Sequence, residues 1–262
     1  MIPYSMIVAT KRDVKALKPL FVNTSLDTEI IIVDSNYNNK TKKYLKSQLG
    51  TYEKIVYAPV KKKVLNLKRD FSQALNTALL YAEGEWILRA DDNLELHPDF
   101  FTRIEEDINY FGREIPNSKF AVIGRKLWET LGEKKWKDNP NFPNRYTKVT
   151  NPKFTFSFSI YKREVMNTLN GYLELFDAGW GYEDTHFLLR LLLLGYQTFF
   201  DKDMLAFSSA HSQGRFDFDI TEFLYKIEEF EARCGKIRSY NNFDYKTDNE
   251  TFLELKDAYI IK

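Results

Sequence analysis

The chain has 262 residues, of which 44% are hydrophobic and 16% aromatic. This length and apolar share fit one large α/β domain, or a domain with an extension, that can bury its own core. The single cysteine, Cys234, excludes an internal disulfide framework and favours a reducing compartment, so we expect a cytoplasmic location. A net charge of +1 gives no overall field that would indicate a nucleic acid or an anionic surface as partner.

No segment indicates insertion into a membrane. The apolar run near the N-terminus is too short for a signal peptide, and no stretch reaches the roughly 18 apolar residues of a transmembrane helix. Any membrane contact would therefore be peripheral. Charge is uneven along the chain, because residues 40–69 are rich in lysine and residues 217–231 in acids.

The first hundred residues alternate between strand and helix patterns. We predict strands over 5–10, 29–33, 54–59 and 86–90. Helices are predicted over 13–21, near 44–49, over 71–82 with Gly84 as C-cap, and over 99–110. A strand, helix, strand order implies parallel strands with right-handed crossovers.

Polar residues follow three of these strands. Residues 10–13 follow the first, residues 34–36 follow the second, and Asp91-Asp92-Asn93 follow the fourth. Because the carboxyl ends of parallel strands gather at one edge of a sheet, and ligands bind there, we expect these residues to share a site.

The pattern loosens between residues 111 and 152, which include four prolines and the basic aromatic patch 134–137. Short strands are predicted over 120–123, 154–161, 198–201 and 205–208, and a helix over 162–169. Residues 219–233 have the spacing of an amphipathic helix.

The segment GWGYEDTHFLLRLLLLGY, residues 179–196, places an adjacent acid pair directly before an apolar run. The run 185–194 predicts a helix buried on most of its surface. Glu183 and Asp184 fit the first turn of that helix, where its dipole favours acids. Alternatively, Gly181 lets the backbone approach a ligand and Trp180 offers a flat face, so that a carboxylate beside an aromatic platform would handle a sugar.

Two motifs resemble those of GT-A glycosyltransferases. GWGYED, followed by a leucine-rich helix containing Arg190, resembles the acceptor-side motif of family-2-like enzymes and of the β-1,4-galactosyltransferase group. GEWILRADDNLELHPDF resembles the segment that carries the DxD motif of these enzymes. The resemblance implies an α/β GT-A fold, with a Rossmann-like, mixed and mainly parallel sheet flanked by helices. It also implies a domain over 1–215, with a nucleotide-binding half (1–110) and an acceptor half (111–215), before a mainly helical extension (216–262).

The resemblance also implies the donor and metal sites. A donor nucleotide would contact Thr10, Arg12, Asp34, Arg69, Asp91 and Asp92. A divalent cation, Mn²⁺ or Mg²⁺, would be held by Asp91, Asn93 and His211. Asn93 departs from the family pattern, since an amide replaces a carboxylate. Most of these assignments have a simpler alternative: a solvated turn for Asp91-Asp92-Asn93 and for Arg69, a helix cap for Asp34, and a structural role for His211.

On the acceptor side, Asp184 matches the catalytic base, and Glu183 would hold an acceptor hydroxyl. Trp180 and Gly181 would lie against the acceptor sugar. We therefore predict an inverting glycosyltransferase that uses a nucleoside diphosphate sugar, preferably a UDP-sugar, and a glycan or glycoconjugate acceptor. The alternatives are a sugar or nucleotide binding protein that has lost turnover, which Asn93 suggests, and a less favoured glycosyltransferase of modified DNA, which the lysines of 40–69 and 134–137 suggest.

Overall fold

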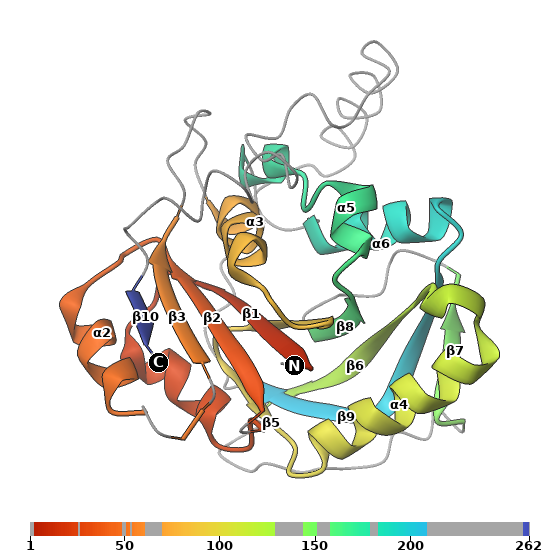
Figure 1. The fold of residues 1–262 in the computed structure, drawn as a ribbon, viewed down its shortest axis with the longest axis horizontal. Helices are drawn as coiled ribbons and strands as arrows, with labels where there is room; N and C mark the ends of the chain where they lie inside the picture. The colour runs from red at the N-terminus through yellow and green to blue at the C-terminus, as the bar shows by residue number, and fades with distance from the viewer. Residues whose placement is uncertain are drawn as a thin grey trace.

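The computed structural model describes residues 3–25, 27–48, 51–52, 54–60, 70–128, 144–150, 158–178, 183–208 and 259–261. Within these residues the chain is an α/β protein in which ten strands form a single curved sheet with helices on both faces (Figure 1). The strand order is β10-β3-β2-β1-β4-β8-β6-β9-β5, and β7 also pairs with β9. No helix in the described part of the chain is long and apolar enough to cross a membrane.

The strands are β1 (Tyr4–Thr10), β2 (Thr28–Asp34), β3 (Lys54–Pro59), β4 (Trp86–Asp91), β5 (Leu94–Leu96), β6 (Phe120–Trp128), β7 (Tyr146–Val149), β8 (Phe158–Lys162), β9 (Gln197–Ser208) and β10 (Tyr259–Ile261). The helices are α1 (Val14–Leu17), α2 (Asn39–Lys46), α3 (Phe71–Tyr81), α4 (Phe100–Glu114), α5 (Val165–Leu169) and α6 (Glu183–Leu193). Short 3₁₀ helices are η1 (Lys18–Phe21), η2 (Pro116–Ser118) and η3 (Glu174–Ala178).

The parallel pairing predicted for the first half is confirmed. Strands β3, β2, β1 and β4 are parallel neighbours. Strand β8 then runs antiparallel to both β4 and β6, and β6 is parallel to β9. The sheet is therefore mixed, with its parallel block formed by the strands of the first hundred residues.

Both faces of the sheet are covered. Along β1 the side chains alternate, so that Ile7 and Ala9 pack in one apolar cluster with residues of α3, α5 and α6. Met6 and Val8 pack in the other, with residues of η1, α2 and α4. Figure 1 shows α3, α5 and α6 on one side of the curved sheet and α2 and α4 on the other. Strands buried on both faces explain the continuous apolar runs in the sequence.

Two of the predicted strands are one element. The segments 198–201 and 205–208 both belong to β9, which is twelve residues long. The register of β9 against β6 shifts between Gly124 and Arg125. Gly124 pairs with Asp201 and Arg125 with Leu205, so the residues between those two partners on β9 are extra. Such an irregularity accommodates extra residues without ending a strand. In the sequence these residues resembled a turn between two strands.

The prediction that Gly84 is a helix C-cap was wrong. Helix α3 ends at Tyr81, and its C-cap, Ala82, has an extended backbone. Gly84 is instead required for close approach of two chains, because a Cβ at this position would lie 2.6 Å from the backbone nitrogen of Ser5. Its own N–H donates to the Ser5 hydroxyl over 2.7 Å. The glycine therefore fixes the entry of the chain into β4.

The C-terminal segment contributes a strand to the sheet. Strand β10 pairs antiparallel with β3, with Tyr259 opposite Tyr57. This strand was not predicted, since three residues give no readable periodicity. The amphipathic segment 219–233 and the basic patch 134–137 lie outside the described residues.

The segment before the acid pair is fixed to α3 by polar contacts. The carboxylate of Asp177, in η3, accepts the backbone N–H groups of Ser72 (2.8 Å) and Gln73 (3.0 Å) at the start of α3. One turn later, the Asn76 side chain accepts from the Tyr172 N–H (2.7 Å) and donates to the Tyr172 carbonyl (2.9 Å). Burial raises the pKa of Asp177, and the two N–H groups oppose that shift. A residue a hundred positions along the chain thus caps the helix.

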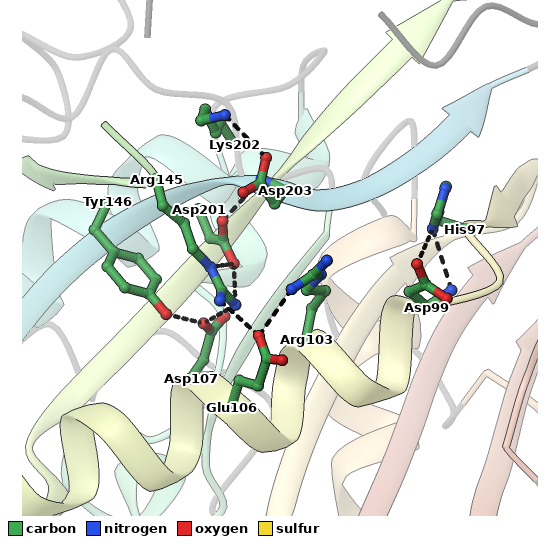
Figure 2. Close-up of polar contacts among 10 residues, drawn as sticks. All are labelled: His97, Asp99, Arg103, Glu106, Asp107, Arg145, Tyr146, Asp201, Lys202 and Asp203. Atoms are coloured by element: carbon green, nitrogen blue, oxygen red, sulfur yellow. Dashed lines mark hydrogen bonds and ion pairs between the residues drawn. The ribbon is translucent and has the colours of Figure 1, made fainter. Parts of the chain in front are cut away.

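A second polar network joins α4, β7 and β9 (Figure 2). Arg145 lies at its centre, with Nη2 3.0 Å from Asp107 Oδ1 and 3.2 Å from Asp201 Oδ2. The Tyr146 hydroxyl donates to the same Asp107 oxygen over 2.8 Å. Asp107 is fully buried, and burial together with the nearby Asp201 carboxylate raises its pKa. The network ties the short strand β7 to the rest of the fold.

We predict that Asp177→Ala lowers the free energy of unfolding by about 2 kcal/mol, because it leaves two buried N–H groups at the start of α3 unpaired. Urea unfolding followed by circular dichroism measures this change. Asp13→Ala is the matched control, since Asp13 caps the short helix α1 at an exposed position. Its loss should be well under half as large, and equal losses would contradict the role given to Asp177.

We predict that Asp107→Asn makes stability less dependent on pH. A raised pKa means that the folded protein keeps a proton that the unfolded chain releases, so this group's stabilisation is complete in acid and is lost as pH rises from about 4. Asparagine mimics the protonated form, so the variant should gain on the order of 1 kcal/mol relative to wild type between pH 5 and pH 9. Urea unfolding at each pH tests this, with Asp203→Asn as a control for the loss of one carboxyl group. Parallel curves for Asp107→Asn and wild type would refute the prediction.

Candidate active site

The carboxyl ends of β1, β2 and β4 meet at one edge of the sheet, as predicted. In the pairing register Thr10 lies opposite Asp34, and Ala9 lies opposite Asp91. Parallel pairing therefore brings residues from three distant parts of the sequence together. The donor-side candidates among the described residues lie at this edge.

Asp92 joins the first strand end to the fourth. Its Oδ2 accepts from the Thr10 hydroxyl over 2.8 Å, and its Oδ1 lies 3.3 Å from Arg12 Nη1. The Arg12 N–H in turn donates to the Thr10 oxygen over 3.1 Å. Asp92 is nearly buried, whereas the Arg12 side chain is 38% exposed and remains accessible to a ligand. The turn after β1 is therefore held by these contacts and presents a partly exposed cation.

Asp34 lies at the predicted edge, but both of its carboxylate oxygens accept hydrogen bonds from the protein itself. Its Oδ2 accepts from the Tyr57 hydroxyl (2.7 Å) and its Oδ1 from the Asn36 N–H (2.8 Å). Tyr37 stacks on the Tyr57 ring with centroids 4.6 Å apart. Burial raises the pKa of Asp34, and the two hydrogen bonds oppose that shift. This residue is only 1% exposed, so it shapes the turn 35–38 at the end of β2.

Asp91 lies between two cations. Its Oδ2 is 2.9 Å from Lys126 Nζ, on β6, and its Oδ1 is 3.5 Å from Arg89 Nη2, on β4. The Asp91 side chain is 22% exposed, so it remains partly open to solvent. Lys126 gave no signal in the sequence, because only the sheet brings β6 near this strand end.

The donor set at this edge fits a hard divalent cation only in part. Asp91 and Asp92 supply carboxylate oxygens, which Mg²⁺ and Mn²⁺ prefer, and such ions commonly take one or two carboxylates plus substrate phosphates. Asn93 is buried, and its side-chain amide donates to the Ser208 hydroxyl over 2.8 Å, which fixes it to the end of β9. Among the described residues no group of three or more His, Cys, Asp or Glu side chains could hold a metal ion by itself.

The acid pair opens α6, as predicted. Glu183 and Asp184 form the first turn, while Phe187, Leu188 and Leu191 are buried in the core. Glu183 Oε1 lies 3.4 Å from Arg89 Nη2, so this acid faces strand β4, which also carries Asp91. Burial raises the pKa of Glu183, the adjacent Asp184 raises it further, and Arg89 opposes both. Asp184 Oδ1 accepts from the Thr185 N–H over 2.7 Å.

Sequence reasoning missed Arg89. Alternate residues of a strand point to the same face, so its position two residues before Asp91 was a readable signal that the two side chains share a face. Its contact with Glu183 was not readable, because 94 positions separate the two residues. Four of the predicted site residues lie outside the described residues: Arg69, Trp180, Gly181 and His211.

Solved structures with a similar fold include two complexes with nucleotide sugars. TarS 1–349 of S. aureus in complex with UDP-GlcNAc matches with a TM-score of 0.62 and 16% identity, over 88% of this chain and 65% of that one. The mannosyltransferase PcManGT of Pyrobaculum calidifontis, in complex with GDP-Man and Mn²⁺, matches with a TM-score of 0.59 and 16% identity, over 97% and 70% of the two chains. The chain therefore spans just under two thirds of the TarS fragment. No curated protein sequence matches it significantly.

Family comparisons agree with the geometry of the strand ends and the acid pair. The model for the N-terminal domain of galactosyltransferase matches residues 141–223, which include the acid pair. The model for glycosyl transferase family 2 matches residues 5–169, well over half of the chain. The chain therefore has the GT-A fold and belongs to glycosyltransferase family 2.

Proposed function

We propose that this protein transfers a sugar from a nucleoside diphosphate donor, preferably a UDP-sugar, to a hydroxyl of a glycan or glycoconjugate, with inversion at the anomeric carbon. One observation carries the proposal: the acids at the donor edge and the acid pair of α6 approach each other across Arg89. Asp91 and Glu183 both lie within 3.5 Å of the same guanidinium nitrogen. A transferase must hold donor and acceptor side by side, and this arrangement would place their two sites next to each other.

The donor side would be bound at the strand ends. Arg12 offers a partly exposed guanidinium that suits phosphate oxygens, and the rigid turn after β1 would hold the nucleotide. Asp34 acts mainly by shaping the turn 35–38, and Arg69 is proposed to reach the diphosphate. A bound divalent cation, held by Asp91, Asn93 and His211, would neutralise the charge that develops on the leaving diphosphate. The complex of the similar mannosyltransferase with GDP-Man and Mn²⁺ supports this choice of cofactor.

The acceptor side would be formed by the start of α6. In the proposed mechanism Asp184 removes the proton of the acceptor hydroxyl as the bond to the donor sugar forms on the face opposite the leaving diphosphate. Glu183 holds an acceptor hydroxyl, and Trp180 with Gly181 supports the acceptor sugar. We place the catalytic domain at residues 1–215, with halves 1–110 and 111–215, and propose that the extension 216–262 is mainly helical apart from β10. A cytoplasmic location remains a proposal that rests on the single cysteine.

The alternatives rest on weaker observations. The Asn93 side chain donates a hydrogen bond to Ser208, which weakens the proposed metal site. This contact favours the first alternative, a binding protein without turnover. The basic run 40–69 is a weak argument for DNA as acceptor. Lys54, one of its members, is buried in ion pairs with Glu29 and Glu83, each over 2.7 Å. That lysine would not contact a phosphate backbone.

A thermal shift screen tests the donor class. At about 100 times its dissociation constant a ligand stabilises the folded state by about 2.7 kcal/mol, which corresponds to roughly 5 to 10 °C for a domain of this size. We expect such a shift with UDP or a UDP-sugar in the presence of Mn²⁺ and a much smaller one without metal. Asp91→Ala should remove the metal-dependent part. If none of the nucleotides shifts the melting temperature, with or without metal, the proposal is contradicted.

Asp184→Asn tests the chemistry. The variant should bind the donor with unchanged affinity but lose about 100-fold or more in turnover, which is the scale of general base catalysis. Release of the nucleoside diphosphate from the donor measures turnover, and calorimetry measures binding. Asp99→Asn is the matched control, because this carboxylate is exposed in the turn before α4. Turnover within a few-fold of wild type would show that Asp184 is not the base.

A further inference from the structure

A buried arginine lies between the two halves of the proposed site. Arg89 is in β4 and is only 2% exposed. Its Nη2 lies 3.5 Å from Asp91 Oδ1 and 3.4 Å from Glu183 Oε1. The same nitrogen therefore lies within ion-pair distance of both acids. A movement of the guanidinium towards one acid weakens its interaction with the other. Its guanidinium also packs 5.7 Å from the ring centroid of Phe71, the first residue of α3.

The two acids depend on Arg89 unequally. Asp91 has a second cation, Lys126, at the shorter distance of 2.9 Å. Glu183 has a side chain that is 12% exposed, and within the described residues Arg89 is the cation at ion-pair distance from it. A buried carboxylate that loses its charged partner is strongly destabilised. Removal of Arg89 would therefore affect Glu183 far more than Asp91.

The neighbouring acid increases this dependence. Asp184 directly follows Glu183 in the first turn of α6, so two carboxyl groups lie close together. Both carboxylates act electrostatically on the Arg89 guanidinium. One buried cation opposite this pair reduces the repulsion between its members and fixes the first turn against β4.

We propose that Arg89 is a positioning residue for sugar transfer, which holds Glu183 against β4 and thereby sets the position of the adjacent Asp184. The inference rests on the proposed function, in which Glu183 and Asp184 handle the acceptor. Arg89 acts through Glu183 and does not itself touch the substrate. It also links the donor edge to the acceptor acids, since the residue two positions along the same strand is Asp91.

A double-mutant cycle tests the proposal. Arg89→Met keeps the length of the side chain and removes its charge, and Glu183→Gln removes the charge of its partner. Each single variant should lower donor turnover by about 10-fold or more, while the donor KM changes by less than about 3-fold. The double variant should fall no further than the worse single variant, because both changes break the same interaction. Losses that multiply would overturn the proposal.

A second cycle separates the two acids. Combined with Asp91→Asn, Arg89→Met should give losses that multiply, because Lys126 still holds Asp91 when the arginine is absent. If the Arg89 and Asp91 substitutions are coupled while those of Arg89 and Glu183 are not, Arg89 acts on the donor side and the proposal is overturned. Arg89→Lys should recover part of the turnover, since it restores the cation without the planar fork.

Arg145→Met is the matched control, because Arg145 is a mostly buried arginine paired with carboxylates in the network of Figure 2. It should lower the melting temperature but leave turnover per folded molecule unchanged. If Arg89→Met behaves in the same way, Arg89 is merely structural and the proposal fails.

Wild-type protein that consumes no nucleotide sugar would instead refute the proposed function. Melting temperatures in the first cycle would still decide whether Arg89 and Glu183 depend on each other, and additive losses would refute that dependence.

Discussion

The parallel pairing of β1 with β2 and β4 is the constraint on which the rest of the site depends. Each parallel pair needs a crossover connection, so the strands begin at one edge of the sheet and end at the other. Their register sets Thr10 beside Asp34 and Ala9 beside Asp91. A slip of one residue would move every side chain of a strand to the other face, so the two apolar clusters keep this register fixed. The core thereby determines where the polar ends lie.

Buried charges then connect the segments that the sheet alone does not join. Asp177 fixes the chain before the acid pair to the start of α3, and Arg145 fixes β7 to α4 and β9. Such groups add little net stability, because removing a charge from water offsets much of the gain from pairing. They act mainly by permitting one arrangement of the segments, since any other leaves a buried charge unpaired. At the proposed site Arg89 has this function between β4 and α6.

The two family comparisons divide the chain in a way that the structure explains. The model for family 2 ends at residue 169, before the acid pair, while the galactosyltransferase model covers residues 141–223. The strand ends with Thr10, Asp34 and Asp91 thus belong to the first match and the acid pair to the second. Strand β8 and helix α5 lie where the two matches overlap. The strand β8 pairs with β4, which carries Asp91, so this overlap joins the two halves within one sheet.

Local patterns in the sequence determined much of the fold. Apolar runs predicted the buried strands, helical spacing predicted α3, α4 and α6, and strand order predicted the parallel sheet, because each of these depends on neighbouring residues. The same patterns placed Thr10, Asp34 and Asp91 at one edge and Glu183 with Asp184 at the start of a helix. Their roles in the reaction remain predictions that come from family resemblance.

Only the tertiary structure decided which of these residues touch. The contacts of Lys126 with Asp91, of Arg89 with Glu183 and of Asn93 with Ser208 join residues 35, 94 and 115 positions apart. Gly84 is a further example. A glycine just after a helix predicts a C-cap, but its role in the structure comes from the close approach of Ser5, which is distant in the sequence. Contacts of this kind follow from sheet register and from the need to pair buried charges. Neither is set by adjacent residues, and a single sequence therefore does not reveal them.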